Sequence, residues 1–283
     1  MIRLCAFADE ASSSIDGQIN ALRRNDIKFI EVRGINGKNI SALTIDEARE
    51  YASAFSSAGI TVWSIGSPIG KVALDSDLDA HIDLLHHVCK LAQIFKTDKI
   101  RMFSFFKAHN SARVIEMLRR MTSVAAGYGI RLCHENEKEI YGEDLARVCE
   151  LLENVDGLEC VYDPANFVQV GENAAYARNI LTKHITYYHI KDIDSKTGEL
   201  VPSGYGDADI SGLVATLSPE EDHVLTVEPH LALFEGYSEI DGAEMKNRFK
   251  FASSDAAFDA ACEALVGIIK ENGYKKVKGG YSK

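Results

Sequence analysis

Four residues with the chemistry of metal ligands stand at or near the ends of strand-like apolar runs in the second half of the chain. Glu135 ends IRLCHE, Asp163 ends LECVYD, His189 lies near the end of ITYYHIKD, and Glu228 ends VLTVE. Three carboxylates brought together repel one another unless a cation neutralises them. With one imidazole they suit a divalent ion that prefers oxygen and tolerates nitrogen, Mn²⁺ first and Mg²⁺, Co²⁺ or Zn²⁺ as alternatives.

Each of these residues has an ordinary explanation when it is taken alone. A glutamate at a strand end can cap the following loop, and Asp163 before Pro164 is a common way to open a turn. His189 could be a hydrogen-bonded core histidine. Their convergence is harder to explain without a metal, because an unpaired carboxylate is costly at the end of an apolar strand. We therefore predict one divalent ion bound by all four residues.

The elements that must position these residues follow a regular rhythm. Strand-like runs begin near residues 2, 28, 60, 99, 130, 158, 184 and 222. Helical patterns fill most of the intervals, at 14–27, 44–59, 77–95, 111–128, 144–152, 174–181, 209–217 and 255–271. Eight strands alternating with helices predict a single (β/α)8 barrel over residues 1–283, with a doubly wound sheet as the alternative. Residues 275–283 form a basic tail that we expect to be mobile.

The period of a strand predicts where the four residues point, because successive side chains face opposite sides of the sheet. The alternate positions carry mostly large apolar residues, as packing beneath helices requires: Leu132, Tyr162, Ile190 and Val227. The four candidate ligands should therefore face the barrel axis. They should meet at the C-terminal mouth, which is where barrel enzymes keep their chemistry.

Composition narrows the classes of protein that this chain could belong to. It has 283 residues, 46% hydrophobic, and a formal net charge of −11, which argues against a protein that tracks a nucleic-acid backbone. No apolar run approaches the roughly 18 residues of a membrane span. A strand is expected from residue 2, so we expect no signal peptide. Six cysteines without a C-x-x-C pair suggest free thiols in a reducing cytoplasm. A homo-oligomer is compatible with all of this.

Several strings in the chain resemble the xylose-isomerase-like barrel family, which includes sugar isomerases and epimerases. The strongest are CHENE, YDPANF, YHIKD and TVEPH, with EVRG, GSPIGK and RMFSFF earlier in the chain. The resemblance covers essentially the whole sequence. It implies one metal ligand from each of strands five to eight, matching Glu135, Asp163, His189 and Glu228. It also implies that Glu135 and Glu228 double as the acid/base pair.

The chain departs from the ketose 3-epimerase pattern at three positions. Asn166 stands where those enzymes usually have a histidine, Tyr141 where they tend to have a glutamate, and Ser195 where they tend to have an arginine. These departures leave the four metal ligands intact and put a free ketohexose substrate in doubt. The additional histidines of the multi-zinc endonuclease branch are not found in the sequence.

Other polar residues near the strand ends are candidates for substrate binding. Arg33, Lys71 and Lys191 are cations that follow or close strands, and GSPIGK also offers backbone N–H groups beside Lys71. These cations predict an anionic sugar derivative, with Lys71 and Arg33 as its contacts. A further four residues flank the ligands and could bind hydroxyl groups or orient the ligands: His134, Asn136, Asn166 and His230.

These features together predict a divalent-metal-dependent isomerase or epimerase of a sugar, sugar phosphate or sugar acid, which acts through an enediolate. A carboxylate could remove a proton beside a carbonyl and return it to the same carbon or to its neighbour. The sequence does not choose between epimerisation and isomerisation. Two alternatives stay open: a metal-dependent lyase or dehydratase on a sugar-like substrate, and a sugar-binding barrel without catalysis.

Overall fold

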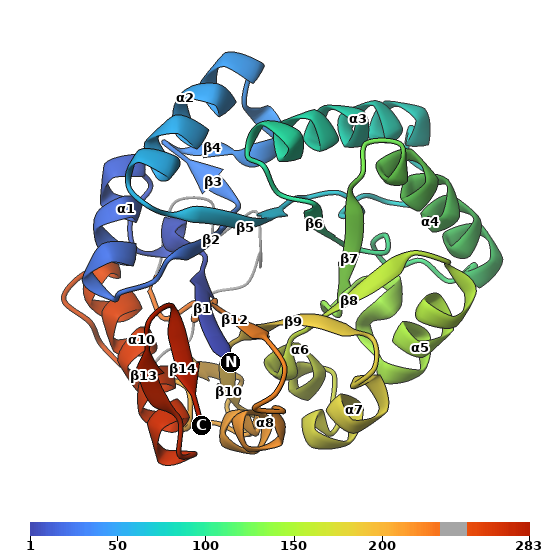
Figure 1. The fold of residues 1–283 in the computed structure, drawn as a ribbon. Coiled ribbons are helices and arrows are strands. Elements are labelled where there is room, and N and C mark those ends of the chain that lie inside the picture. The colour runs from blue at the N-terminus through green and yellow to red at the C-terminus, as the bar shows by residue number, and fades with distance from the viewer. Residues whose placement is uncertain (233–247) are drawn as a thin grey trace.

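The computed structural model describes residues 1–232 and 248–283, and these form a closed barrel of eight parallel strands surrounded by helices (Figure 1). The sheet runs in the order β12-β9-β8-β7-β6-β5-β2-β1, and pairing of β12 with β1 closes it. The barrel strands are β1 (Ile2–Ala6), β2 (Phe29–Val32), β5 (Thr61–Gly66), β6 (Lys99–Met102), β7 (Arg131–Glu135), β8 (Leu158–Tyr162), β9 (Ile185–Ile190) and β12 (His223–Val227). This confirms the predicted (β/α)8 fold.

The helices lie outside the barrel, between successive strands (Figure 1). They are α1 (Ile15–Arg24), α2 (Ile45–Ser57), α3 (Leu78–Ile94), α4 (Ser111–Ala126), α5 (Leu145–Asn154), α6 (Pro164–Gln169), α7 (Ala174–Leu181), α8 (Ile210–Thr216) and α10 (Ser254–Glu271). Their ends follow local chemistry. Thr44 and Glu47, for example, form the reciprocal capping box that the sequence indicated for α2.

Strand alternation divides the core into two parts. One set of strand side chains faces outward into the main core beneath the helices and includes Leu132, Tyr162, Ile190 and Val227. The other set fills the barrel interior as a smaller cluster of Cys5, Cys133, Val161, Tyr187 and Val224. The candidate ligands continue this interior face toward the C-terminal ends of the strands. The packed interior cluster therefore forms the floor on which the site is built.

Short elements that the sequence analysis did not anticipate lie in the loops. Two hairpins are formed by β3 (Gly34–Ile35) with β4 (Lys38–Asn39) and by β10 (Asp192–Asp194) with β11 (Glu199–Val201). Single 3₁₀ turns occur at Ala8–Glu10, Ile40–Ala42 and Tyr141–Glu143. The first hairpin directly follows β2, so it rises from the same end of the barrel as the candidate ligands.

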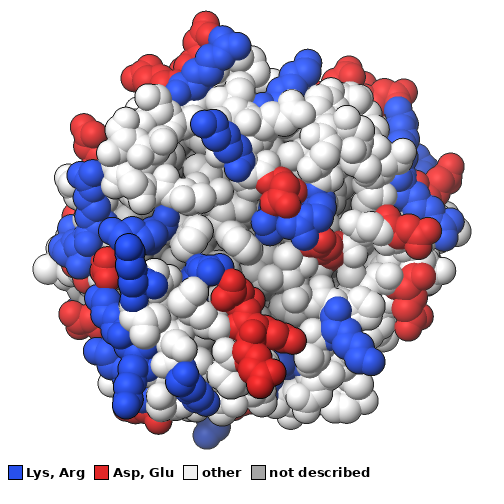
Figure 2. Space-filling view, in the orientation of Figure 1, with Lys and Arg blue, Asp and Glu red and all other residues white. Residues whose placement is uncertain are grey.

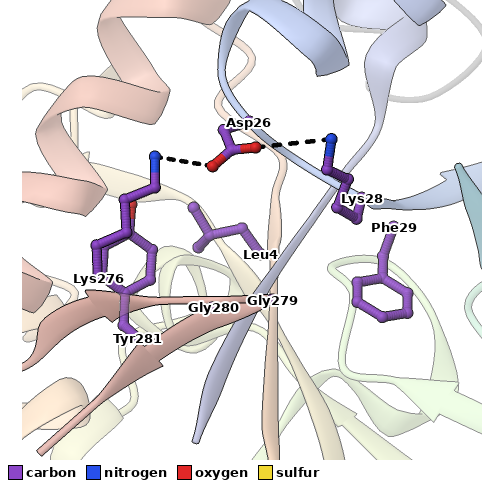
Figure 3. Close-up of a pocket in the computed structure, with 8 residues that line it drawn as sticks. All are labelled: Leu4, Asp26, Lys28, Phe29, Lys276, Gly279, Gly280 and Tyr281. Atoms are coloured by element: carbon purple, nitrogen blue, oxygen red, sulfur yellow. Dashed lines mark ion pairs between the residues drawn. The ribbon is translucent and has the colours of Figure 1, made fainter. Parts of the chain in front are cut away.

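The expectation of a mobile basic tail is wrong. Residues Lys275–Val277 (β13) and Gly280–Ser282 (β14) form a hairpin, and Tyr281 pairs with Ile2 at the start of β1. In Figure 2, Lys and Arg side chains gather over the region where Figure 1 places β13, β14 and α10. The hairpin borders a pocket of about 40 Å³, where Asp26 lies between Lys28 and Lys276 (Figure 3). This pocket is at the N-terminal end of the strands, opposite the candidate ligands.

Two further expectations concern the whole chain. Within residues 1–232 and 248–283, no helix combines the length and the apolar character needed to cross a membrane. All six cysteines are free thiols, and five of them are buried. The thiols therefore contribute to packing in this structure and form no disulfide.

Candidate functional site

The structure brings the four predicted ligands together at the C-terminal mouth of the barrel. Glu135 is the last residue of β7, Asp163 follows β8, His189 lies in β9, and Glu228 follows β12. One potential ligand atom from each residue lies within 4.8 Å of the corresponding atoms of the other three. All four residues are buried, with exposed fractions of 3% or less. Strand ends from four consecutive barrel strands thus converge on one small volume.

The His189 ring sits between the two glutamates. Its Nδ1 atom lies 3.1 Å from Glu135 Oε1 and 3.0 Å from Glu228 Oε2. Its Nε2 atom lies 3.0 Å from Glu31 Oε2, on the side of the ring away from the cluster. The Nδ1 atom is therefore the histidine ligand atom that faces the candidate metal site.

Each of the two glutamates is shared between His189 and an arginine. Arg101 Nε forms a 3.1 Å ion pair with Glu135 Oε2. Arg33 Nη1 donates a 3.1 Å hydrogen bond to Glu228 Oε1. In both cases the arginine holds one carboxylate oxygen while the other oxygen faces His189 Nδ1. The arginines thereby fix which oxygen of each glutamate points into the cluster.

The donor set fits a cation. Asp163 Oδ2 and Glu228 Oε2 are buried and accept no hydrogen bond from the described residues. Lys191 Nζ is 3.1 Å from Asp163 Oδ2, but the contact lacks hydrogen-bond geometry, as does the contact of Glu228 Oε2 with His189. Buried carboxylate oxygens that lack a donor are costly. A divalent ion coordinated by these oxygens would remove that cost.

The charges in the cluster perturb one another strongly. Burial raises the pKa of Glu135 and of Glu228, but His189 together with a second cation, Arg101 for Glu135 and Lys191 for Glu228, leaves both pKa values below their usual range. Burial disfavours the charged form of His189, yet Glu135, Glu31 and Glu228 hold its pKa well above the ordinary value. Burial raises the pKa of Asp163 to about 7, with Lys191 opposing the shift. Both glutamates are therefore poised as carboxylates.

A second group of potential ligands, Glu10, Glu228 and His230, already surrounds a cation of the protein itself. The Arg33 guanidinium reaches Glu10 Oε1 at 3.3 Å, Glu228 Oε1 at 3.1 Å and His230 Nε2 at 3.5 Å. It also donates to both oxygens of Asp9, at 2.9 and 3.0 Å. Arg33, predicted to contact an anionic substrate, is thus surrounded by carboxylates of the chain.

A pocket of about 670 Å³ opens beside the cluster. The residues that line it include Glu135 and Glu228, both arginines, Lys71 with Glu137, and part of the β3–β4 hairpin. Lys71 Nζ lies 3.3 Å from Glu137 Oε2 and 4.4 Å from the centre of the Phe103 ring. Gly70 allows the backbone of the loop to pass close to the backbone of Phe103. Its φ is +85°, and a Cβ atom at this position would lie 2.0 Å from the Phe103 carbonyl oxygen. The volume suits a small organic ligand.

The N–H groups of the GSPIGK loop have partners within the chain. Ile69 N donates to Ser67 Oγ, Gly70 N to His81 Nε2, and Lys71 N to the Pro68 carbonyl. These three N–H groups therefore form hydrogen bonds that hold the shape of the loop. What it presents to the pocket is the Lys71–Glu137 ion pair.

The other predicted site residues have different positions. The Asn136 side chain bonds the backbone N and O of Asp163, each at 2.9 Å, and so fixes that ligand. Asn166 Nδ2 donates to Glu135 Oε1 at 3.3 Å. His134 points to the opposite face of β7, where its Nε2 atom lies 2.9 Å from Ser104 Oγ. His134 is therefore not among the residues that line the pocket.

Several residues that build the site were not identified from the sequence as site residues. These are Asp9, Glu10, Glu31, Arg101 and Glu137. Each is charged and buried, and Glu31 and Arg101 stand inside short buried strands. A charged side chain within such a strand needs a charged or hydrogen-bonding partner, and this requirement is the feature of the sequence that marks Glu31 and Arg101 as candidates. Their partners stand on other strands or loops, so periodicity within one strand could not pair them.

Comparison with known proteins identifies the family and the fold. The family model described as xylose isomerase-like TIM barrel matches residues 19–246. No curated protein matches the chain. An L-ribulose 3-epimerase structure superposes with a TM-score of 0.74 at 17% identity, over 96% of each chain.

Two further structures have the same fold. The probable 3-DHS dehydratase AsbF from Bacillus anthracis gives a TM-score of 0.72 at 18% identity, over 94% of this chain and 99% of that one. The IOLI protein with a bound zinc atom gives 0.69 at 15% identity, over 95% and 99%. At these identities the structural likeness shows the fold, while the family model covers most of the sequence. The chain therefore belongs to the xylose isomerase-like TIM barrel family.

Proposed function

We propose that the protein is a divalent-metal-dependent isomerase or epimerase of a sugar or sugar derivative. The observation that carries this proposal is the pair Glu135 and Glu228. Each directs one oxygen toward His189 Nδ1, and both residues line the same pocket. Two carboxylates that share a pocket with a cation site are the groups needed to move a proton at a carbon beside a carbonyl.

Glu135, Asp163, His189 and Glu228 would hold the ion. The set of three carboxylates and one imidazole suits Mn²⁺, with Mg²⁺, Co²⁺ and Zn²⁺ as alternatives. The zinc of the IOLI structure supports a metal site in this fold without fixing the ion here. When bound, the metal supplies a Lewis acid that polarises a carbonyl oxygen and favours the enediolate.

The protein groups then divide the proton transfer between them. One glutamate removes the proton beside the carbonyl, while Arg101 holds Glu135 and Arg33 holds Glu228 in position. The other returns the proton from its own side of the substrate. Return to the same carbon gives the epimer, and return to the adjacent carbon gives the isomer. Phe103 and the Lys71–Glu137 pair line the wall of the pocket, and the ion pair would hold the remaining hydroxyl groups.

The ion pairs favour a neutral sugar over an anionic derivative. Every lysine and arginine that lines the pocket in the described part of the chain has a carboxylate partner: Arg33 with Asp9, Lys38 with Glu47, Lys71 with Glu137, and Arg101 with Glu135. An anionic substrate would have to displace or compete with these carboxylates. Neutral hydroxyl groups can instead donate to the carboxylates and accept from the cations.

A dehydratase is the second candidate, favoured by the likeness to the probable 3-DHS dehydratase AsbF. Abstraction of a proton beside a carbonyl begins both reactions. The two differ afterwards, because a dehydratase expels a hydroxyl group from the neighbouring carbon, whereas an epimerase or isomerase returns the proton.

Turnover in D₂O separates these candidates. The metal-free protein is supplied with Mn²⁺ and incubated with a panel of ketoses, aldoses, sugar acids and sugar phosphates, and the products are followed by NMR. Deuterium at the carbon beside the carbonyl, together with a new epimer or isomer, is the expected result. An unsaturated product would establish a dehydratase. Metal binding without exchange in any compound would instead indicate a binding protein.

A further inference from the structure

Glu31 occupies an unusual place for an acidic residue. It lies in β2, is 1% exposed, and points into the barrel interior beneath the candidate metal site. Three donors converge on its carboxylate: His189 Nε2 at 3.0 Å and Thr226 Oγ1 at 3.4 Å from Oε2, and Tyr187 OH at 2.9 Å from Oε1. Ser64 Oγ lies 3.2 Å from Tyr187 OH and extends the network.

Stability alone does not account for this carboxylate. Removing an ionised group from water is costly, and an apolar side chain of similar volume often serves a core as well or better. The neighbouring interior cluster of Cys5, Cys133 and Val161 is apolar. Arg101 Nε lies 3.9 Å from Glu31 Oε1 but closer to Glu135 Oε2, at 3.1 Å. A glutamate kept at this position therefore calls for a task that an apolar residue cannot perform.

We propose that Glu31 is the positioning residue that orients His189 for metal binding. This inference rests on the metal site of the proposed function. An acceptor at Nε2 keeps the proton on that nitrogen, so the lone pair of Nδ1 is the one available to an ion. Nδ1 is the atom that lies between Glu135 Oε1 and Glu228 Oε2.

Packing supports the same orientation. The edge-to-face contact of Phe7 with the His189 ring has a centroid distance of 5.1 Å, and the contact of Tyr187 has one of 5.6 Å. These aromatic rings confine the plane of the imidazole, and Glu31 decides which nitrogen carries hydrogen within that plane. Tyr187 and Thr226 in turn hold the Glu31 carboxylate in place.

Two measurements on Glu31 variants test this role: their affinity for a metal ion, and the state of the two His189 ring nitrogens. Mn²⁺ affinity is measured by titration calorimetry for the wild type, Glu31→Leu and Glu31→Gln. Glu159→Gln is the matched control, because Glu159 is a strand carboxylate that bonds Arg131 and Thr186 away from the cluster. Glu31→Leu should weaken binding by about 10- to 100-fold. Glu31→Gln should lose less Mn²⁺ affinity, since its amide oxygen can still accept a hydrogen bond from Nε2–H. Glu159→Gln should bind Mn²⁺ as tightly as the wild type.

A spectroscopic measurement separates positioning from general damage to the fold. In the Zn²⁺-loaded protein, ¹⁵N NMR of His189 should show a protonated Nε2 and a metal-bound Nδ1 in the wild type. The hydrogen-bonded Nε2–H signal should persist in Glu31→Gln and be lost in Glu31→Leu. If Glu31→Leu does not fold, the affinity and spectrum of Glu31→Gln decide the question.

The outcomes are distinct for the two proposals. If the wild-type protein binds no divalent ion, both the proposed metal site and the proposed role of Glu31 are refuted. Tight binding by the wild type, with equal affinity and an unchanged Nε2–H signal in the folded Glu31 variants, would remove the role of Glu31 alone. Nε2 coordination in the wild type would also overturn it.

Discussion

Arg33 Nη1 donates a hydrogen bond of 3.1 Å to Glu228 Oε1, and the other nitrogens of the same guanidinium donate to both oxygens of Asp9. The arginine thus ties the end of β12 to the turn that follows β1. It also leaves Glu228 Oε2 directed at His189 Nδ1, 3.0 Å away. A residue that the sequence suggested for substrate binding is therefore positioned to shape a metal ligand.

The first prediction concerns the stability that Arg33 provides. Arg33→Met should lower the free energy of unfolding by about 3–5 kcal/mol, because it leaves buried carboxylates without their cation. Arg24→Met is the control, since Arg24 pairs with Asp255 and Asp259 at the surface, where such pairs contribute under about 1 kcal/mol. Urea unfolding of the metal-free proteins measures both. Equal losses in the two variants would show that Arg33 is not a buried structural cation.

The second prediction concerns the two candidate acid/base residues. Glu135→Gln and Glu228→Gln should each lower turnover by several orders of magnitude, because an amide cannot carry the transferred proton. Both substitutions also weaken the metal site, so activity is compared at saturating Mn²⁺ on a substrate identified by the D₂O panel. Near-native kcat in either variant under that condition would exclude its glutamate from proton transfer.

Much of this arrangement could be predicted from sequence because local rules determine it. The helix at Ile45–Ser57 begins at its capping box, and the eight strands begin within about a residue of their predicted starts. Period-2 alternation placed the four ligands on the barrel interior. The charged partners Glu31 and Arg101 could not be assigned in the same way, because the pattern within one strand does not show which residue of another strand it will contact, here His189 and Glu135.

The third prediction uses the buried His134. Burial lowers its pKa to about 4, whereas the unfolded chain takes up this proton near a pKa of about 6.5. Because the unfolded chain binds this proton more tightly than the folded chain, the unfolded state becomes more favoured as the pH falls from about 6.5 to about 4. This residue should lower the unfolding free energy of the wild type by about 3 kcal/mol between pH 7 and pH 4. His134→Gln has no titrating group at this position, so this part of the loss should be missing in the variant. Equal pH slopes of unfolding free energy in the two proteins would contradict this assignment.

The fourth prediction concerns the C-terminal hairpin. Tyr281 is 6% exposed and packs against the main core, so Tyr281→Ala should lower the free energy of unfolding by about 3 kcal/mol. Val277 on the same hairpin is 42% exposed, and Val277→Ala should change stability by under about 0.5 kcal/mol. Mn²⁺ affinity should be unchanged in both. A small effect of Tyr281→Ala would show that the hairpin docks weakly.

The hairpin also shows why its conformation was not predicted. A run rich in lysine and glycine has the composition of a mobile terminus. Its order depends on tertiary contacts: Tyr281 opposite Ile2, and Lys276 with Asp26 at 2.8 Å. No local pattern within residues 275–283 signals these partners, which lie at the other end of the chain.

The central claim is that Glu135, Asp163, His189 and Glu228 bind one divalent ion, and anomalous diffraction from crystals grown with Mn²⁺ tests it most directly. The account predicts a single manganese peak among the four side chains, with ligand distances near 2.0–2.6 Å and Nδ1 as the histidine ligand. Well-ordered crystals with no peak at this site, and with the four side chains more than about 5 Å apart, would contradict it.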